Sequence, residues 1–126
     1  MTLQNRDPVS RNVGTELLFE NDRVRVWDMQ LAPGESSELH HHDSDYVFAY
    51  VSPVRLESTE PGGEPKVSVF EDGYVQYNVV GRAGRTHRVR NVGEEAHRHV
   101  IVEILGPSVS EDTLPPEHNG RRSEPA

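Results

Sequence analysis

The chain has 126 residues, enough for one hydrophobic core but too few for a second folded module beside it. Its formal charge of −8 at pH 7 opposes contact with the phosphates of nucleic acids and with anionic membrane surfaces, so neither is an expected partner. No cysteine is present, which excludes disulfides and thiolate metal sites and leaves nitrogen and oxygen as ligands for any metal.

Nothing in the sequence predicts export or membrane insertion. Residues 1–13 lack the apolar core of a signal peptide. No stretch approaches the roughly 18 consecutive apolar residues of a membrane-spanning helix. Because the chain also lacks cysteine, as is common in a reducing compartment, we expect a cytoplasmic protein.

Short apolar and alternating runs predict a series of β-strands, and no segment shows sustained helical periodicity. Residues 32–35 form a turn signal after the first run, and residues 71–73 favour a hairpin between the runs that flank them. Gly and Pro recur about every ten residues, a spacing typical of an antiparallel sandwich or barrel. The predicted strands cover residues 23–31, 46–51, 66–70, 74–80, 86–90 and 97–105.

The C-terminal segment, residues 107–126, has four prolines, six charged residues and few apolar ones. Such a composition cannot bury enough apolar surface to hold the segment in place, so we expect a Pro-rich mobile tail. The remaining residues, 1–106, form the single predicted domain. Removal of residues 108–126 should therefore leave the melting temperature nearly unchanged.

Six of the seven histidines fall between positions 40 and 99. In a strand, residues i and i+2 face the same way, so His40 and His42 should project together while His41 points to the other face. His87, on a neighbouring strand, could complete a three-histidine site. Imidazole suits divalent Fe, Mn, Co, Ni, Cu and Zn, and three protein ligands leave positions open for water or substrate.

The spacing around these histidines resembles the two sequence motifs of the cupins. Gly34-x5-His40-x-His42 is similar to the first motif, and Gly84-x2-His87-x3-Asn91 to the end of the second. The resemblance covers about residues 22–105 and extends to small single-domain cupins, including those associated with β-alanine degradation. It implies an all-β, antiparallel, cupin-type jelly-roll barrel. The metal would lie inside on His40, His42 and His87, with Gly34, Gly84 and Asn91 in turn positions.

Two positions depart from the cupin pattern. The family usually has a glutamate as fourth ligand where this chain has Tyr46, and a proline where it has Arg82. Tyr46 has the parity of His40 and His42, so we expect a catalytic phenol near the metal that donates a hydrogen bond or relays a proton. A tyrosinate ligand and an aromatic core residue are the alternatives. Asp43 and Asp45 are rival carboxylate ligands, but their parity favours solvated turn residues.

Two further groups of basic residues flank the expected site. His97 and His99 form a second His-x-His pair, which could line the same cavity or lie on the outer face beside Glu103; a role other than metal ligation is favoured. Three arginines surround His87, and one or two of them could face inward to bind a substrate carboxylate, although a solvated strand face is the alternative for each. These are Arg85, Arg88 and Arg90.

The resemblance and the three histidines together predict a metal-dependent dioxygenase, most simply an iron enzyme, that acts on a small organic acid or diketone-like metabolite. A non-redox isomerase or lyase and a non-catalytic cupin that binds a small ligand are the alternatives. Similar small cupins commonly pair through sheet faces and N-terminal strands. We therefore expect a homodimer that covers the outward-facing apolar residues Val47, Ala49 and Val51.

Overall fold

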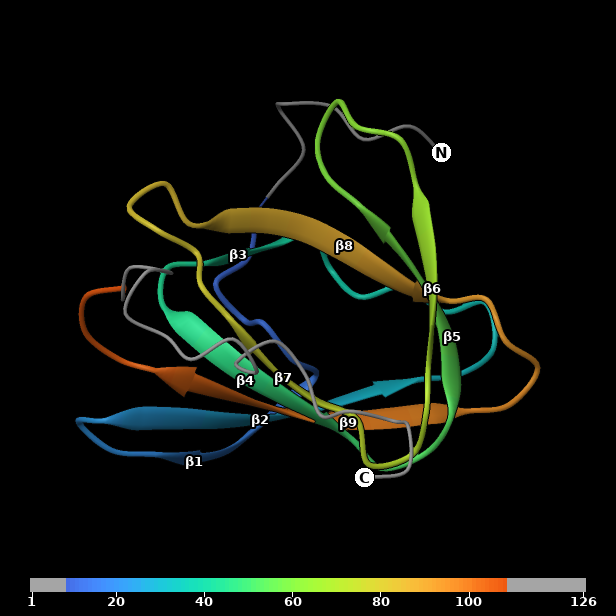
Figure 1. Ribbon diagram of the computed structural model, residues 1–126, viewed down its shortest axis with the longest axis horizontal. Helices are drawn as coiled ribbons and strands as arrows, with labels where there is room; N and C mark the ends of the chain where they lie inside the picture. The colour runs from blue at the N-terminus through green and yellow to red at the C-terminus, as the bar shows by residue number, and fades with distance from the viewer. Residues whose placement is uncertain (1–8, 109–126) are drawn as a thin grey trace, which may run out of the picture.

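The computed structural model describes residues 9–108, and all regular structure in this range is β-strand (Figure 1). The all-β prediction is therefore confirmed. No helix in residues 9–108 is long and apolar enough to cross a membrane. The strands are β1 (Glu16–Glu20), β2 (Val24–Leu31), β3 (His40–His42), β4 (Asp45–Tyr50), β5 (Val54–Thr59), β6 (Lys66–Phe70), β7 (Val75–Asn78), β8 (Arg85–Asn91) and β9 (His97–Ile104).

The strands form two sheets that face each other, and every strand pair is antiparallel. One sheet has the order β1-β2-β9-β4-β7 and the other the order β3-β8-β5-β6. Figure 1 shows β3 and β8 on one side of the barrel and β2, β9 and β4 on the other. Most neighbours in a sheet are distant in sequence, which is the mark of a jelly roll and confirms that part of the prediction.

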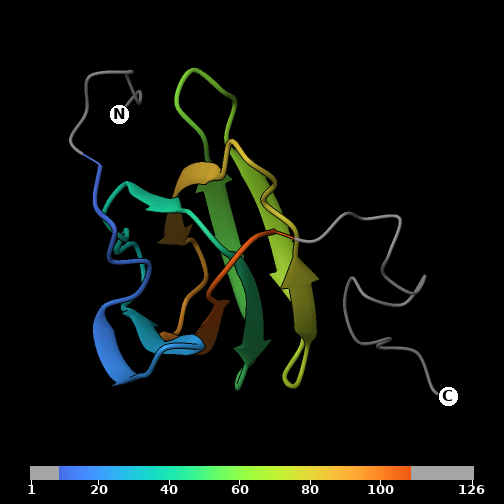
Figure 2. The ribbon, with the colours of Figure 1, turned by 90° about the vertical axis from the view of Figure 1, so that its left-hand side faces the viewer.

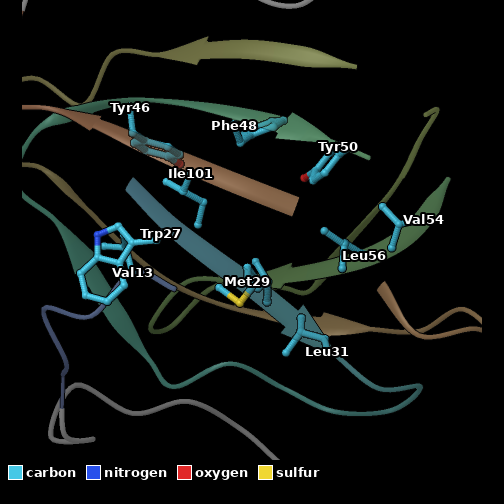
Figure 3. Close-up of a cluster of buried hydrophobic side chains, with 11 residues drawn as sticks. Val13, Trp27, Met29, Leu31, Tyr46, Phe48, Tyr50, Val54, Leu56 and Ile101 are labelled. Atoms are coloured by element: carbon cyan, nitrogen blue, oxygen red, sulfur yellow. The ribbon is translucent and has the colours of Figure 1, made fainter. Parts of the chain in front are cut away.

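The core lies between the two sheets, because alternate side chains of the central strands β4 and β9 are buried there. Tyr46, Phe48 and Tyr50 stand in a row along β4, opposite residues from the other sheet (Figure 3). Val13, from the segment before β1, is fully buried in the same cluster. The other members of the core are Trp27, Met29, Leu31, Val54, Leu56, Val89 and Ile101.

The predicted hairpin around residues 71–73 is wrong, although both of its strands exist. β6 pairs with β5 and β7 pairs with β4, so the connection carries the chain from one sheet to the other. The turn itself is present: Tyr74 N donates to Glu71 O at 3.1 Å, and Gly73 has a positive φ of 82°. Gly73 N and Tyr50 O are also bonded, which ties the turn to β4 rather than closing a local pair.

β1 and β5 were not predicted, and β3 was assumed only in order to place His40 and His42; each of the three lacks a clear pattern in the sequence. β1 exposes all five of its residues, so no face alternates. β3 is only three residues long and consists of histidines alone. β5 begins directly after Pro53 and ends in half-buried polar residues.

The predicted tail lies almost wholly outside the described residues, which end at 108. Ser108 itself is held, because its hydroxyl bonds the Asp45 carboxylate and accepts a hydrogen bond from Gly81 N at 3.0 Å. The proposed truncation would remove this residue. A cut after Ser108 is therefore the better test of whether the remaining residues contribute to stability, and that contribution stays a prediction.

Candidate metal centre and its cavity

The candidate site is built on the antiparallel pair of β3 and β8. His40 is the direct partner of His87 in this ladder, and His42 is the partner of Arg85. Side chains directly opposite in an antiparallel pair lie on the same face, about 5 Å apart at Cβ. All four side chains therefore point into the barrel. His41 occupies the opposite face, as the strand alternation predicts, where its Nδ1 is 2.6 Å from Thr86 Oγ1.

A glycine at the start of β8 allows the two strands to meet. Gly84 has a φ of 72°, and a Cβ on it would lie 2.6 Å from the carbonyl oxygen of His42 and 2.4 Å from His41 Nε2. Only a residue without a side chain fits so close to backbone. The turn position that the cupin resemblance assigns to Gly84 thus has a physical cause.

The three histidines converge on one point. His40, His42 and His87 each offer one nitrogen, and these nitrogens all lie within 4.8 Å of one another. Among residues 9–108 this is the one group of three or more histidine or acidic side chains so arranged. Nε2 of His42 and Nε2 of His87 are 3.1 Å apart. A single ion can therefore be held by all three rings.

Hydrogen bonds outside the cluster hold two of these rings, and one of the bonds decides where a ring carries its proton. Nδ1 of His40 lies 2.9 Å from the carbonyl oxygen of Glu38, which can only accept, so Nδ1 carries the proton and Nε2 keeps its lone pair. Nδ1 of His87 lies 3.1 Å from Ser58 Oγ, a hydroxyl that can accept from this ring or donate to it. Nδ1 of His42 is buried without a hydrogen-bond partner among residues 9–108, so no contact there dictates its tautomer.

Burial keeps the three rings neutral. It lowers the pKa of His40 to about 4 and that of His42 to about 2, and it holds the pKa of His87 well below its usual range. The positive charge of Arg85 acts in the same direction on all three. Neutral imidazoles that converge on one point are what a divalent transition metal requires, so these residues fit such an ion.

Tyr46 lies against the histidine cluster from the opposite sheet. Its ring stacks on that of His42, with centroids 3.9 Å apart and planes inclined by 13°. Its hydroxyl oxygen accepts a hydrogen bond from Arg85 Nη1 at 3.1 Å. Burial raises the pKa of Tyr46, more than Arg85 lowers it, so the phenol keeps its proton at neutral pH. That proton is free to be donated into the cavity.

The two rival carboxylates do not join the cluster. Asp43 is exposed and accepts two hydrogen bonds from Arg11 at 2.9 Å, as expected of a surface turn residue. The prediction that Asp45 is also a solvated turn residue is wrong. Asp45 is 1% exposed and accepts hydrogen bonds from Tyr77 Oη at 2.9 Å and Val80 N at 3.0 Å, so it anchors the loop after β7.

The second His-x-His pair lies inside the barrel and apart from the three-histidine group. His99 lines the central cavity, and its Nδ1 is 2.7 Å from Nε2 of His97. Both rings are buried. Glu103 is buried on the same strand, where its carboxylate accepts a hydrogen bond from Trp27 Nε1 at 2.7 Å. Neither histidine joins the candidate ligand set, in keeping with the predicted role other than ligation.

The barrel encloses one central cavity of about 280 Å³, lined by the three candidate ligands and by His99. One end holds the three histidines, Tyr46 and Arg85. The other end is aromatic, because Phe48, Tyr50 and Phe70 pack with ring centroids 4.6 to 5.8 Å apart. A cavity of this size, in which polar groups and aromatic rings share the wall, is suited to a small metabolite.

Solved structures place this architecture among known folds. A cupin domain from Bordetella pertussis superposes with a TM-score of 0.64 and 26% identity, over 71% of this chain and 90% of that one. A cupin 2 conserved barrel protein from Salinispora arenicola gives a TM-score of 0.55 and 21% identity, over 80% and 82% of the two chains. The chain is a small cupin by fold. A double-stranded β-helix protein from Klebsiella pneumoniae agrees, with a TM-score of 0.56 and 20% identity over 79% and 86%.

Comparison at the level of sequence adds nothing for this cupin, because no family model and no curated protein matches it. The association with β-alanine degradation therefore has no support beyond the resemblance. What the comparisons establish is the fold that was predicted from the two histidine motifs.

Two residues of the site, Arg85 and Ser58, were not assigned to it from the sequence. The sequence analysis did not distinguish Arg85 from Arg88 and Arg90. Strand alternation does distinguish it, because Arg85 is two residues from His87 and shares its face. Ser58 was not recognised, because nothing in the sequence predicted that β5 would bring it to His87. Its position depends on the pairing of β5 with β8.

Proposed function

We propose that this cupin is a metal-dependent enzyme, a dioxygenase that acts on a small organic acid or diketone-like metabolite. The metal is a divalent transition ion, with iron the first candidate, held by His40, His42 and His87. One observation carries the proposal: three buried, neutral imidazoles converge within 4.8 Å in the wall of a cavity large enough for a metabolite. Three protein ligands leave positions open for substrate and O2.

A bound ion of this kind would supply Lewis acidity and electron transfer to the reaction. The chain itself supplies the surroundings. Glu38 O and Ser58 hold the rings of His40 and His87, and Tyr46 offers its hydroxyl proton from the opposite sheet.

A non-redox reaction at the same site is the second candidate, and the contact between Tyr46 and Arg85 favours it. A phenol whose oxygen accepts from a guanidinium donates its own proton more readily, so Tyr46 could protonate an enolate or a leaving group. Isomerisation or elimination next to a carbonyl group would need such a donor and no O2.

Two measurements test these proposals. Metal analysis of freshly purified protein, before and after incubation with Fe²⁺, should give about one ion per chain. Substrate-dependent O2 uptake by the iron-loaded protein should then accompany turnover of small 2-oxo acids or diketones. Turnover that continues without O2 would favour the isomerase or lyase instead. A protein that takes up no transition metal would contradict both enzyme proposals.

A further inference from the structure

The charge inside the barrel is opposite to that of the whole chain. The chain carries −8 overall, but no Asp or Glu of residues 9–108 lines the central cavity. Among the lysines and arginines of the same residues, Arg85 alone lines the cavity. The cavity wall therefore offers an anion one positive charge, although the chain as a whole is negative.

The guanidinium of Arg85 has room for a ligand. Its Nη1 donates to Tyr46 Oη at 3.1 Å, and its Nε lies 3.7 Å from Glu60 Oε2, too far for a hydrogen bond. Nη2 has no hydrogen-bond partner among residues 9–108. The side chains of Arg85 and Glu60 are 36% and 59% exposed, so this pair is weak and can be displaced.

The position of Arg85 fixes which part of a ligand would be charged. Arg85 is the ladder partner of His42, so its head belongs to the histidine end of the cavity. From Tyr46 the wall of β4 continues through Phe48 to Tyr50, roughly 13 Å along the strand. Phe70 also lines that end, with its ring centroid 4.6 Å from that of Tyr50.

From this arrangement we infer that the cavity binds a small monocarboxylic acid with an apolar or aromatic tail. The carboxylate is held by Arg85 together with the Tyr46 hydroxyl, and the tail lies along Phe48 and Tyr50. The inference rests on the proposed function, because it names the substrate class of the same cavity. It also orients that substrate: the carbon next to the carboxylate faces the three histidines.

The same geometry selects against two other classes of ligand. A dicarboxylate would place its second charge among the rings of Phe48 and Tyr50, beside His99, whose burial lowers its pKa and keeps it neutral; no Lys or Arg of residues 9–108 lines that end. A neutral amide of the same shape would keep the tail contacts but lose the charged hydrogen bonds to Arg85. Selectivity for a monocarboxylate should therefore come from Arg85 and the aromatic end together.

Calorimetric titration of the full chain with phenylacetate, 2-phenylacetamide and glutarate tests the inference. Phenylacetate should bind, and the other two should bind at least about 10-fold more weakly. Arg85→Gln should weaken phenylacetate binding by roughly 10- to 100-fold, and Arg85→Lys by less, because it keeps the charge but not the fork. Glu60→Gln should tighten it by up to about 5-fold.

Arg55→Gln is the matched control, because Arg55 is exposed on β5 and its loss changes the net charge equally. It should bind phenylacetate as the unaltered protein does. Circular dichroism establishes that each variant is folded. Equal binding by Arg85→Gln and the unaltered protein, or equal binding of phenylacetate and its amide, would overturn the inference.

The titrations are run on protein as purified and again after metal removal by a chelator. Loss of affinity in Arg85→Gln in both forms supports the carboxylate site whether or not the metal proposal holds. Absence of metal uptake defeats the proposed function but leaves this comparison intact. The two proposals can therefore fail separately.

Discussion

His40 and His87 are direct partners across the ladder of β3 and β8, with ring centroids 4.6 Å apart. Replacing His40, His42 or His87 singly with Ala should therefore reduce bound transition metal to near background, because two imidazoles hold an ion far less tightly than three. His41→Ala should keep the metal, since His41 faces away. Elemental analysis of purified variants measures both. Metal loss in His41→Ala with retention in His42→Ala would contradict the proposed ligand set.

Tyr46→Phe should retain the metal but lower turnover by about 10²-fold, the effect typical of removing a positioned proton donor. The stacking on His42 survives in this variant, since only the hydroxyl is lost. Tyr46→Glu should bind metal more tightly and turn over more slowly, because a carboxylate would fill an open position. Metal content and steady-state rates test both variants. Unchanged activity in Tyr46→Phe would make this residue ordinary core packing.

Acid should destabilise the metal-free protein. Burial lowers the pKa of His97 to about 4 and that of His99 to about 3, whereas both titrate near 6.5 when unfolded. At a pH between the folded and unfolded pKa values, the unfolded chain binds more protons than the folded one. The free energy of unfolding therefore falls as the pH drops below 6.5. Each such histidine contributes up to about 1.4 kcal/mol per pH unit.

Urea unfolding at pH 7.5, 6.0 and 5.0 in the presence of a chelator measures how steeply the free energy of unfolding changes with pH. His99→Phe should flatten it by about one proton, even if its absolute stability is lower because His97 loses a partner. Val69→Thr, at an exposed position of β6, should leave the slope unchanged. A slope in His99→Phe as steep as in the unaltered protein would contradict the assignment.

Glu103 should destabilise the fold at neutral pH through its charge. Burial raises the pKa of Glu103 despite the hydrogen bond from Trp27. A raised pKa means stability that is present below the unfolded value and is lost as the pH rises through the folded one. Glu103→Gln keeps an acceptor for the indole, so it should be at least as stable at pH 7. Glu103→Leu leaves Trp27 Nε1 unpaired and should cost about 1–3 kcal/mol. Denaturant unfolding at pH 7 separates the two variants.

The predicted homodimer has a specific surface to test. Leu17, Leu18 and Phe19 on β1 are 41%, 46% and 54% exposed, and β1 is the edge of the five-stranded sheet. Of the residues expected to need cover, Val51 is exposed, whereas Val47 and Ala49 are half-buried. Phe19→Asp should give a monomer in light scattering at micromolar concentration, and Val69→Asp on the other sheet should not. A monomeric unaltered protein would contradict the prediction.

The strand-rich pattern and the shared face of His40 and His42 could be predicted from local periodicity, and the motif resemblance added His87 and the cupin barrel. Alternation at two residues places His40 and His42 on one face whatever the tertiary structure. The glycine and histidine spacings then identify the cupin motifs. Of the nine strands in residues 9–108, six carry enough β-branched and aromatic residues to be predicted from their own sequence alone.

The sheet that each strand joins and the surroundings of the histidines depend on contacts between residues far apart in the chain. The hairpin at residues 71–73 failed because local turn chemistry cannot report that β6 and β7 pair with different distant strands. Asp45 is buried because Tyr77 and the loop after β7 cover it, and Arg85 reaches Tyr46 because two sheets close over one cavity. Such contacts join residues more than 30 positions apart, so their energies depend on packing and desolvation that no local pattern encodes.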